Sequence, residues 1–336
     1  MPNPQAVGTQ WLLTQTERAN PRSRLDDQHP GDQAWSTGNR VTPLVHGATY
    51  FADLYARLEA TREGDLVWFT DWRGDPDERL TDDPGSDIVS VLSRAAERGV
   101  DVRGLVWRSH WDKLAFSAEQ NRRPGEQLQQ HGAEVLLDMR VRTGGSHHQK
   151  FVVIRHRDRP KDDVAYVGGI DLCHTRRDDA AHEGDPQAVP MAEEFGPTPA
   201  WHDVQVAISG PAVHDVETVF RERWEDPTPL SRNVFRMLRD RLRGDDVSPD
   251  PLPEQAPRRG APSLHRPGRC AVPHPAAAGA ASGPGGDRRG RPGSGRLLRP
   301  REPRRRPGLR PREGVRHGRP LGERGLRQLQ SPLLDP

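Results

Sequence analysis

The composition of the chain changes abruptly near Pro251, and this change limits where a folded domain can lie. From Pro251 onward there is no Phe, Trp, Tyr, Ile, Met, Lys, Asn or Thr. A segment without these residues cannot bury an apolar core. It contains nineteen arginines and six acidic residues, whereas the rest of the chain holds 31 basic and 42 acidic residues. An acidic body therefore carries a basic tail, and the net charge of +2 conceals both.

Apolar runs in the first 250 residues predict strands that alternate with helices. This alternation is typical of a layered α/β domain, in which ligands bind at strand ends. We expect a polar N-terminal segment over residues 1–37, one α/β lobe over 38–250 and a disordered, low-complexity tail over 251–336. The strands are predicted at 65–70, 100–107, 134–137, 150–154, 164–167 and 204–208, and the helices at 48–62, 87–99, 126–131 and 211–224.

Polar side chains follow several of these strands. Asp71, Asp75, His110, His148 and Asp171 all fall at predicted strand ends. Each of the first three is an ordinary loop residue when taken singly. Because they recur at equivalent positions, we include Asp71 and His110 as supporting residues of a site at that edge.

A histidine and a lysine stand two residues apart within the stretch Gly144–Ile154. In an extended strand such residues point to the same face. His148 and Lys150 therefore face the same way where the chain leaves a glycine-rich turn. An imidazole can attack phosphorus while an ammonium holds a non-bridging oxygen. The pair alone is weak evidence, because the chain has fourteen histidines.

Further motifs follow in a characteristic order. Gly168-Gly169-Ile170-Asp171-Leu172-Cys173 comes after a charged loop, and Trp201-His202-Asp203 comes later. With His147-His148-Gln149-Lys150, this order and spacing resemble the first half of phospholipase D enzymes. The resemblance covers about residues 38–226 and implies a mixed sheet flanked by helices in an α/β/α arrangement.

The resemblance implies a role for each matched residue. His148 would attack phosphorus and form a phosphohistidine, and Lys150 would neutralise the phosphate. Asp171 stands where other superfamily members carry a phosphate-contacting Asn, so we expect it to orient a histidine instead. Gly168 and Gly169 would let the backbone approach the substrate closely.

The remaining matched residues are expected to support the site. His147 is expected to pack in the interior or to bond to a neighbouring carboxylate. His202 and Asp203 belong to the third motif and join Asp71 and His110 in this supporting group.

The sequence departs from the family pattern at Arg155. The first motif usually continues with an aspartate at this position, seven residues after its histidine. That aspartate fixes the geometry around the histidine. Its task must pass to Asp158, Asp163 or Asp171, or remain undone.

A metal centre is the competing interpretation, because histidines and acidic residues are frequent in this part of the chain. No pair has the spacing of a zinc-protease helix or of a Cys-x-x-Cys motif. We therefore expect no metal and no cofactor. The histidines weighed for such a centre are His147, His148, His156, His174 and His182.

The tail is consistent with a second half read in the wrong frame. Phospholipase D enzymes need a second motif whose histidine protonates the leaving alcohol and later activates water. When residues Arg301–Asp335 are back-translated with free synonymous codons and read from the second base, one permitted result contains His-x-Lys-x-x-x-x-Asp and then Gly-Ser-x-Asn. The histidine arises across Pro311 and Arg312, and the lysine across Glu313 and Gly314. We therefore hypothesise a frameshift between roughly Pro251 and Arg301.

The leading hypothesis is a phospholipase D-type phosphodiesterase that is incomplete as written. It would hydrolyse a phospholipid or another phosphodiester, or transfer the phosphatidyl group to another alcohol, with peripheral membrane contact. One alternative is a one-motif nuclease that completes its site as a homodimer. The other is a non-enzymatic remnant with a basic binding tail. The acidic body does not favour specific nucleic-acid binding.

The sequence also bears on where the protein acts. Residues 1–20 lack an apolar core flanked by basic residues, so no signal peptide is predicted. No apolar run approaches the roughly 20 residues of a membrane span. We expect a cytoplasmic protein.

Overall fold

The computed structural model describes residues 34–257, apart from 109–117, 143–144, 189–195, 232 and 245, with ten scattered residues before 34. All the described residues belong to a first unit, Met1–Cys270, which is separate from a second unit, Ala271–Pro336. The fold described below belongs to the first unit, and the predicted second motif lies outside the described residues.

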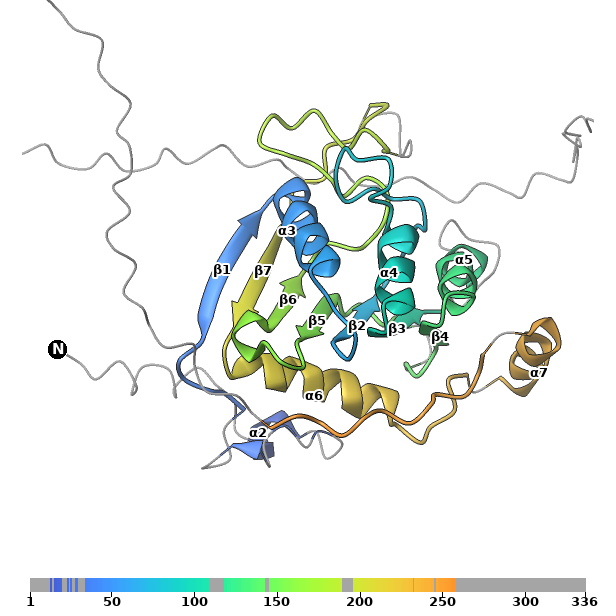
Figure 1. Ribbon diagram of the computed structural model, residues 1–336. Helices are drawn as coiled ribbons and strands as arrows, with labels where there is room; N and C mark the ends of the chain where they lie inside the picture. Colours follow the sequence, from blue (N-terminus) through green and yellow to red (C-terminus); the bar gives the residue numbers. More distant parts are fainter. Residues whose placement is uncertain are drawn as a thin grey trace, which may run out of the picture. The chain divides into compact units, whose positions relative to one another are not determined.

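A seven-stranded mixed sheet forms the centre of the first unit (Figure 1). Its order is β1-β7-β6-β5-β2-β3-β4. The neighbours β2, β3 and β4 are parallel, and all other pairs are antiparallel. The strands are β1 (Arg40–Val45), β2 (Leu66–Asp71), β3 (Asp101–Trp107), β4 (Glu134–Asp138), β5 (Phe151–Arg155), β6 (Val164–Gly168) and β7 (Val204–Ser209).

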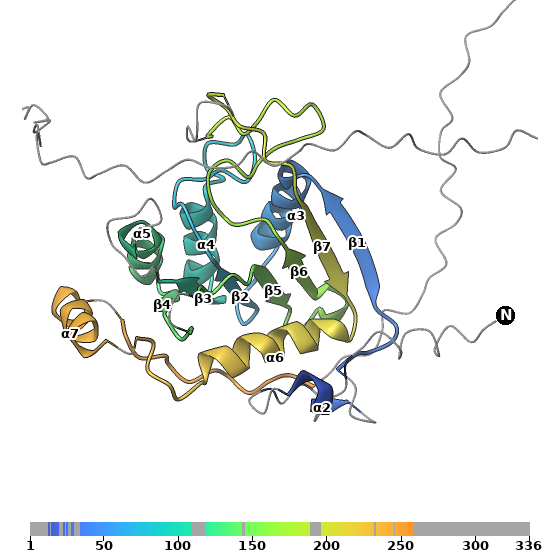
Figure 2. The ribbon, with the colours of Figure 1, turned by 180° about the vertical axis from the view of Figure 1, so that it is seen from behind.

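Helices cover both faces of this sheet (Figures 1 and 2). One face carries α3 (Gly47–Glu59), α4 (Ile88–Glu97) and α5 (Ala118–Gln129), and the other carries α6 (Ala212–Trp224). The described residues also form α2 (Gln15–Arg18), the 3-10 turn η2 (Pro160–Asp162) and α7 (Val234–Arg243). The α/β/α layering and the mixed sheet predicted from the sequence are confirmed.

The alternation of side chains along β2 builds two cores, one on each face. Val67 and Phe69 face α3 and α4, whereas Trp68 faces α6. The Trp68 ring stacks on Phe220 at a centroid distance of 5.1 Å, and Phe220 stacks on Trp224 at 5.4 Å. Burial of each of these large side chains contributes about 1.5–3 kcal/mol, so α6 is held firmly to the sheet.

Local signals in the sequence located most elements correctly. The predicted cap of α4 is confirmed, because the Asp87 side chain accepts a hydrogen bond from the Ser90 N–H at 2.8 Å. The helix predicted at 126–131 begins earlier, at Ala118. Its first half lacks apolar periodicity and is held by Asn121, which donates to the carbonyls of Trp72 and Trp107 at 3.0 and 2.7 Å.

Residues on both sides of the predicted lobe also contact it. His29, from the N-terminal segment, bonds to Asp215 of α6 at 3.0 Å. Beyond residue 250, Leu252 packs against the core beneath α6, and the Pro253 carbonyl accepts a hydrogen bond from Arg221 at 2.7 Å. The folded unit thus extends a few residues past the boundary predicted at 250.

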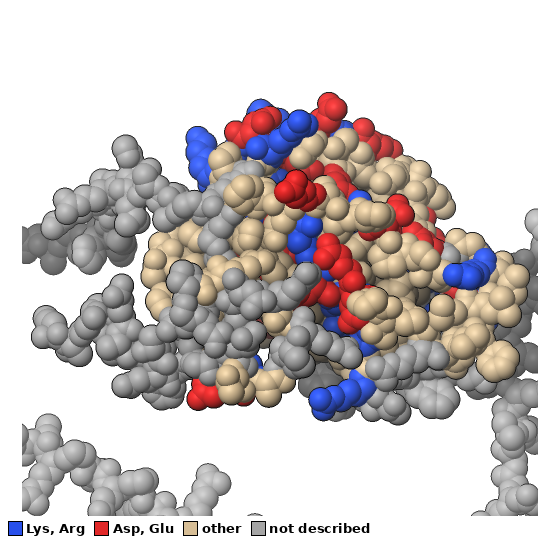
Figure 3. All heavy atoms as spheres, turned by 90° about the horizontal axis from the view of Figure 1, so that it is seen from below, with Lys and Arg blue, Asp and Glu red and all other residues tan. Residues whose placement is uncertain are grey.

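The surface carries charges of both signs. Figure 3 shows Lys and Arg side chains interspersed with Asp and Glu on the visible part of one face. Among the described residues visible there, no broad basic patch of the kind that binds nucleic acid without sequence preference is seen. Within the described part of the chain, every helix is too short or too polar to cross a membrane.

Candidate active site

The pairing of three strands brings the predicted site residues to one edge of the sheet. β2 and β5 are antiparallel with Thr70 opposite Phe151, so the end of β2 meets the start of β5. β5 and β6 are antiparallel with Phe151 opposite Val167, so the end of β6 reaches the same edge. Asp71, Lys150 and Asp171 are therefore neighbours although a hundred residues separate the first from the last.

His148 and Lys150 lie next to each other at this edge, as predicted. The Lys150 Nζ is 3.3 Å from the His148 Nε2. Lys150 is buried with 5% of its surface exposed, whereas His148 is exposed. A substrate can therefore reach the imidazole from solvent and meet a fixed positive charge behind it.

Two carboxyl groups stand behind the lysine. Asp171 Oδ1 lies 3.3 Å from the Lys150 Nζ and also accepts a hydrogen bond from the Arg73 N–H at 3.3 Å. Asp71 accepts hydrogen bonds from the Leu172 and Trp72 N–H groups at 2.8 and 2.9 Å. Asp171 thus holds the lysine, whereas the sequence led us to expect that it would orient a histidine.

The protonation states favour nucleophilic chemistry. Burial of the imidazole and then the Lys150 ammonium lower the pKa of His148 below its ordinary value, with Asp171 opposing them in part. Burial and then the neighbouring Asp171 carboxylate raise the pKa of Asp71 well above its ordinary range. These shifts favour the neutral imidazole of His148 and the protonated form of Asp71.

Trp72 is a site residue that the sequence analysis missed. The His148 ring lies against Trp72 at a centroid distance of 5.2 Å, and the Lys150 Nζ lies 5.5 Å from the centroid of the same indole. Trp72 stacks in turn on Trp107 at 5.8 Å. Its position directly after Asp71, at the end of a buried strand, was the signal that could have identified it.

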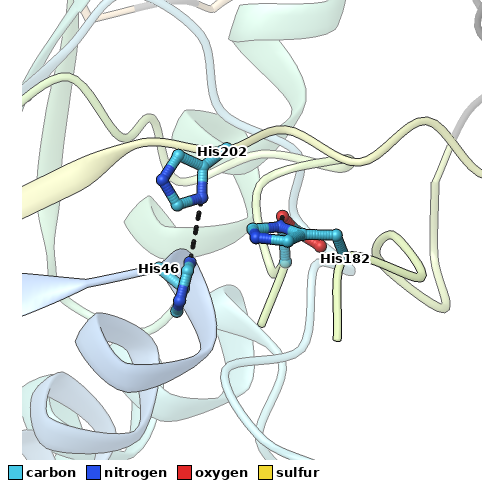
Figure 4. Close-up of side chains that lie close together, drawn as sticks. His46, His182 and His202 are labelled. Carbon is cyan, nitrogen blue, oxygen red and sulfur yellow. Dashed lines mark hydrogen bonds and ion pairs between the residues drawn. The ribbon is translucent and has the colours of Figure 1, made fainter. Parts of the chain in front are cut away.

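Two of the predicted supporting residues make contacts that the sequence did not indicate, although His147 packs in the interior as expected. His147 is buried and bonds to the Gln149 side chain at 3.2 Å, so its partner is an amide and not a carboxylate. Burial, followed by the nearby Arg223, lowers the pKa of His147 to about 3. His202 bonds to His46 at 3.1 Å, as Figure 4 shows. His110 lies outside the described residues.

The close packing of neighbouring side chains explains why positions 168 and 169 are glycines. A Cβ at Gly168 would come within 2.1 Å of the Gln205 side chain, and one at Gly169 within 2.5 Å of the Asp203 carboxylate. The space predicted for a substrate is thus filled by Gln205 and Asp203. Asp203 supports the site indirectly, since it lies against the turn that leads to Asp171.

Arg155, which stands where the resemblance implies an aspartate, is part of a buried ion-pair network. Its guanidinium pairs with Asp163 at 2.9 Å and with Glu217 of α6. Asp163 is therefore engaged by Arg155 and by the His156 N–H at 2.7 Å. Of the three acids considered as replacements, Asp171 is the one in contact with Lys150.

These features define a class of site. An exposed neutral imidazole beside a buried ammonium suits covalent chemistry on a phosphoester. The model of the family described as Phospholipase D matches residues 65–245, which is more than half of the chain. The chain belongs to the phospholipase D family and so falls, at the level of family, among phospholipase D-like hydrolases.

Several relatives share this region. Phospholipase D alpha 1 of Cynara cardunculus is 28% identical over 213 residues, covering 52% of this chain and 26% of the relative. Phospholipase D gamma 1 of Arabidopsis thaliana is 30% identical over 201 residues, covering 47% and 23%. Phospholipase D C of Dictyostelium discoideum is 25% identical over 224 residues, covering 57% and 13%. The chain thus spans at most about a quarter of these three relatives.

A solved structure of polyphosphate kinase from Porphyromonas gingivalis is similar at a TM-score of 0.38 and 18% identity, covering 73% of this chain and 37% of that one. At that score the likeness adds nothing to the assignment of fold or function.

Proposed function

We propose that this chain provides the nucleophilic half of a phospholipase D-type phosphodiesterase. The observation that carries the proposal is the His148 imidazole, exposed and 3.3 Å from the buried Lys150 ammonium. In this role His148 is the nucleophile, and Lys150 binds a non-bridging oxygen of the phosphodiester. Asp171 holds the lysine in place through their ion pair at 3.3 Å.

The reaction takes place in two displacements. His148 Nε2 attacks phosphorus, the bond from phosphorus to the head-group oxygen breaks, and the head-group alcohol leaves with a proton from a second histidine. That histidine then takes a proton from water, which attacks phosphorus and breaks the bond to Nε2. Phosphatidic acid is released and His148 is regenerated.

The second histidine must come from outside the first motif. Among the three lysines of the sequence, Lys150 alone follows a histidine by two residues. We propose that the missing motif is encoded in a neighbouring frame downstream. We propose that the frame change lies between roughly Pro251 and Arg301, and the contacts of Leu252 and Pro253 with the lobe support a position after these two residues. Resequencing the gene through this region tests that part of the proposal.

Phospholipid is the favoured substrate because the matched relatives are named phospholipases D. Such a substrate would bring the protein into peripheral contact with a membrane surface. The charges in Figure 3 do not favour a nucleic acid on the face shown there.

The test uses the gene with its reading frame restored downstream of Pro253. We expect the restored protein to release head-group alcohol from phosphatidylcholine vesicles, and His148→Asn to lower that rate by at least about a thousandfold, as expected when a covalent nucleophile is removed. His131→Asn is the matched control, because His131 is an exposed histidine that pairs with Glu97 at 2.6 Å. A His148→Asn protein as active as this control would refute the proposal. Activity confined to bis(p-nitrophenyl) phosphate would refute its lipid specificity.

A further inference from the structure

Four side chains that can serve as metal ligands converge in a group that does not include His148 or Lys150. His46, Asp178, His182 and His202 each present one donor atom, and all four atoms lie within 4.8 Å of one another. Figure 4 shows the three imidazoles turned toward one another from separate segments of the chain. We call these four residues the histidine cluster.

The contacts inside the histidine cluster match the spacing of ligands around one ion. His46 Nδ1 lies 3.1 Å from His202 Nδ1, and His182 Nδ1 lies 2.9 Å from Asp178 Oδ2. In a tetrahedral zinc site with bonds of about 2.0–2.1 Å, neighbouring donor atoms are about 3.3 Å apart. Small side-chain rotations would bring the donor atoms that are up to 4.8 Å apart to this distance.

The cluster also contains an unsatisfied acid. Asp178 is fully buried, and its Oδ1 has no hydrogen-bond partner among the described residues. An unpaired carboxylate oxygen in the interior is costly unless a cation or a donor compensates it. The Nδ1 atoms of His46 and His202 face each other at 3.1 Å, so each can turn a lone pair toward an ion bound between them.

We propose that the histidine cluster binds one zinc ion. Three imidazole nitrogens and one carboxylate oxygen form a donor set that suits zinc, whereas calcium and magnesium prefer oxygen ligands in larger number. Four protein ligands fill a tetrahedral coordination sphere and leave no position for substrate. The site is therefore structural and separate from the proposed phosphodiesterase chemistry.

The zinc ion joins three segments of the chain, one of which is the loop that also carries Asp171. His46 precedes α3, Asp178 and His182 lie in the loop after β6, and His202 precedes β7. The Ala48 N–H donates to the Asp178 carbonyl at 3.0 Å, so the start of α3 already contacts this loop. The ion fixes the loop that also carries Asp171, and thereby stabilises the edge of the sheet on which Lys150 is held.

Spacing rules could not reveal this site from the sequence. His46 and His202 are 156 residues apart, and sequence patterns for zinc rest on ligands a few residues apart. The pair at 178 and 182 has helical spacing but lies in a loop, where His182 adopts a left-handed backbone with φ of 55°. The expectation that the chain holds no metal followed from local spacing and did not consider such distant ligands.

The test measures metal binding directly on the full-length chain, without an affinity tag and after treatment with a chelator. Zn²⁺ is titrated in competition with a chromophoric chelator, and Co²⁺ is added separately because its visible absorption distinguishes tetrahedral from octahedral coordination. We expect one tight zinc equivalent per chain, a tetrahedral cobalt spectrum, and a higher thermal unfolding midpoint with zinc.

Three variants and one control separate this site from histidines elsewhere in the chain. His202→Ala, Asp178→Asn and His182→Asn each remove one ligand, and the asparagine at 182 tolerates the left-handed backbone. Each should weaken zinc binding at least tenfold and abolish the shift in unfolding midpoint, whereas His131→Ala should behave as the wild type.

Because Asp178 is buried, Asp178→Asn alone can also impair folding, so the exposed His202 provides the decisive variant. If His202→Ala binds zinc with unchanged stoichiometry and affinity, or if the wild type gives an octahedral cobalt spectrum, the proposal is overturned.

Discussion

The interaction of Asp71 with Asp171 predicts a non-additive effect of mutation. Both carboxyls lie behind Lys150, and the neighbouring Asp171 is one cause of the raised pKa of Asp71. At 3.3 Å the attraction between Lys150 and Asp171 is about 5 kcal/mol at an effective dielectric constant of about 20. Removal of one partner of a buried ion pair costs about 3–5 kcal/mol, because the other charge stays buried.

In the Asp171→Asn variant, Asp71 can ionise and compensate part of the Lys150 charge in place of Asp171. Asp71 then no longer faces a carboxylate, so its pKa falls and it compensates the Lys150 charge. We expect Asp171→Asn to lower the free energy of unfolding by about 2 kcal/mol and Asp71→Asn by about 1 kcal/mol, each through a lost hydrogen bond. The double variant has no carboxylate beside the lysine and should lose about 5 kcal/mol.

The assay is urea unfolding of the full-length chain, followed by circular dichroism at neutral pH. The double-mutant cycle should give a coupling energy of about 2 kcal/mol. Adding Lys150→Met to the double variant should restore stability, since the unpaired charge is then gone. If the losses of unfolding free energy in the two single variants add up to the loss in the double variant, the predicted interaction between Asp71 and Asp171 is refuted. An Asp171→Asn protein as unstable as the double variant would refute it as well.

Three further predictions follow from burial and charge. Burial, followed by the neighbouring Asp185, raises the pKa of Glu78 from 4.5 to about 10. Between these two pH values the folded state holds a proton that the unfolded state has lost, so stability falls as pH rises. In thermal unfolding at pH 9, Glu78→Gln should therefore be more stable than the wild type, and a variant whose stability declines with rising pH as steeply as that of the wild type would count against this. Lys150→Met removes a positive charge that lowers the pKa of His148, so this pKa should rise in an NMR titration. The control Lys161→Met changes an exposed lysine and should leave the pKa of His148 unchanged. An equal effect of both variants would contradict the assignment of the shift to Lys150. Phe220→Ala should lower the free energy of unfolding by about 3–5 kcal/mol in urea, and a loss below about 1 kcal/mol would show that α6 is not anchored through this ring.

The sequence predicted those parts of the structure that depend on neighbouring residues. The buried runs of β2 and β3, the Asp87 cap of α4, and the placement of His148 beside Lys150 all follow from local patterns. β1 was not predicted, because Val41 is 59% exposed on an edge strand and the run lacks the alternation of a half-buried strand.

The rest of the site depends on contacts between distant residues. Asp171 approaches Asp71 and Lys150 only because β6, β5 and β2 are adjacent and antiparallel. The position of Trp72 directly after β2 marks it as a residue at this edge, but the approach of its ring to His148 also requires β5 to pair with β2. His202, expected beside the catalytic residues, instead contacts His46.

Direct detection of the covalent intermediate tests the central claim that His148 is the nucleophile. The protein with its reading frame restored is mixed with phosphatidylcholine, quenched in alkali to preserve phosphoramidate bonds, digested and analysed by mass spectrometry. We predict a phosphatidyl adduct on the peptide that contains His148, present during turnover and absent in His148→Asn. Turnover with no adduct at His148, or an adduct on another residue, would contradict the account.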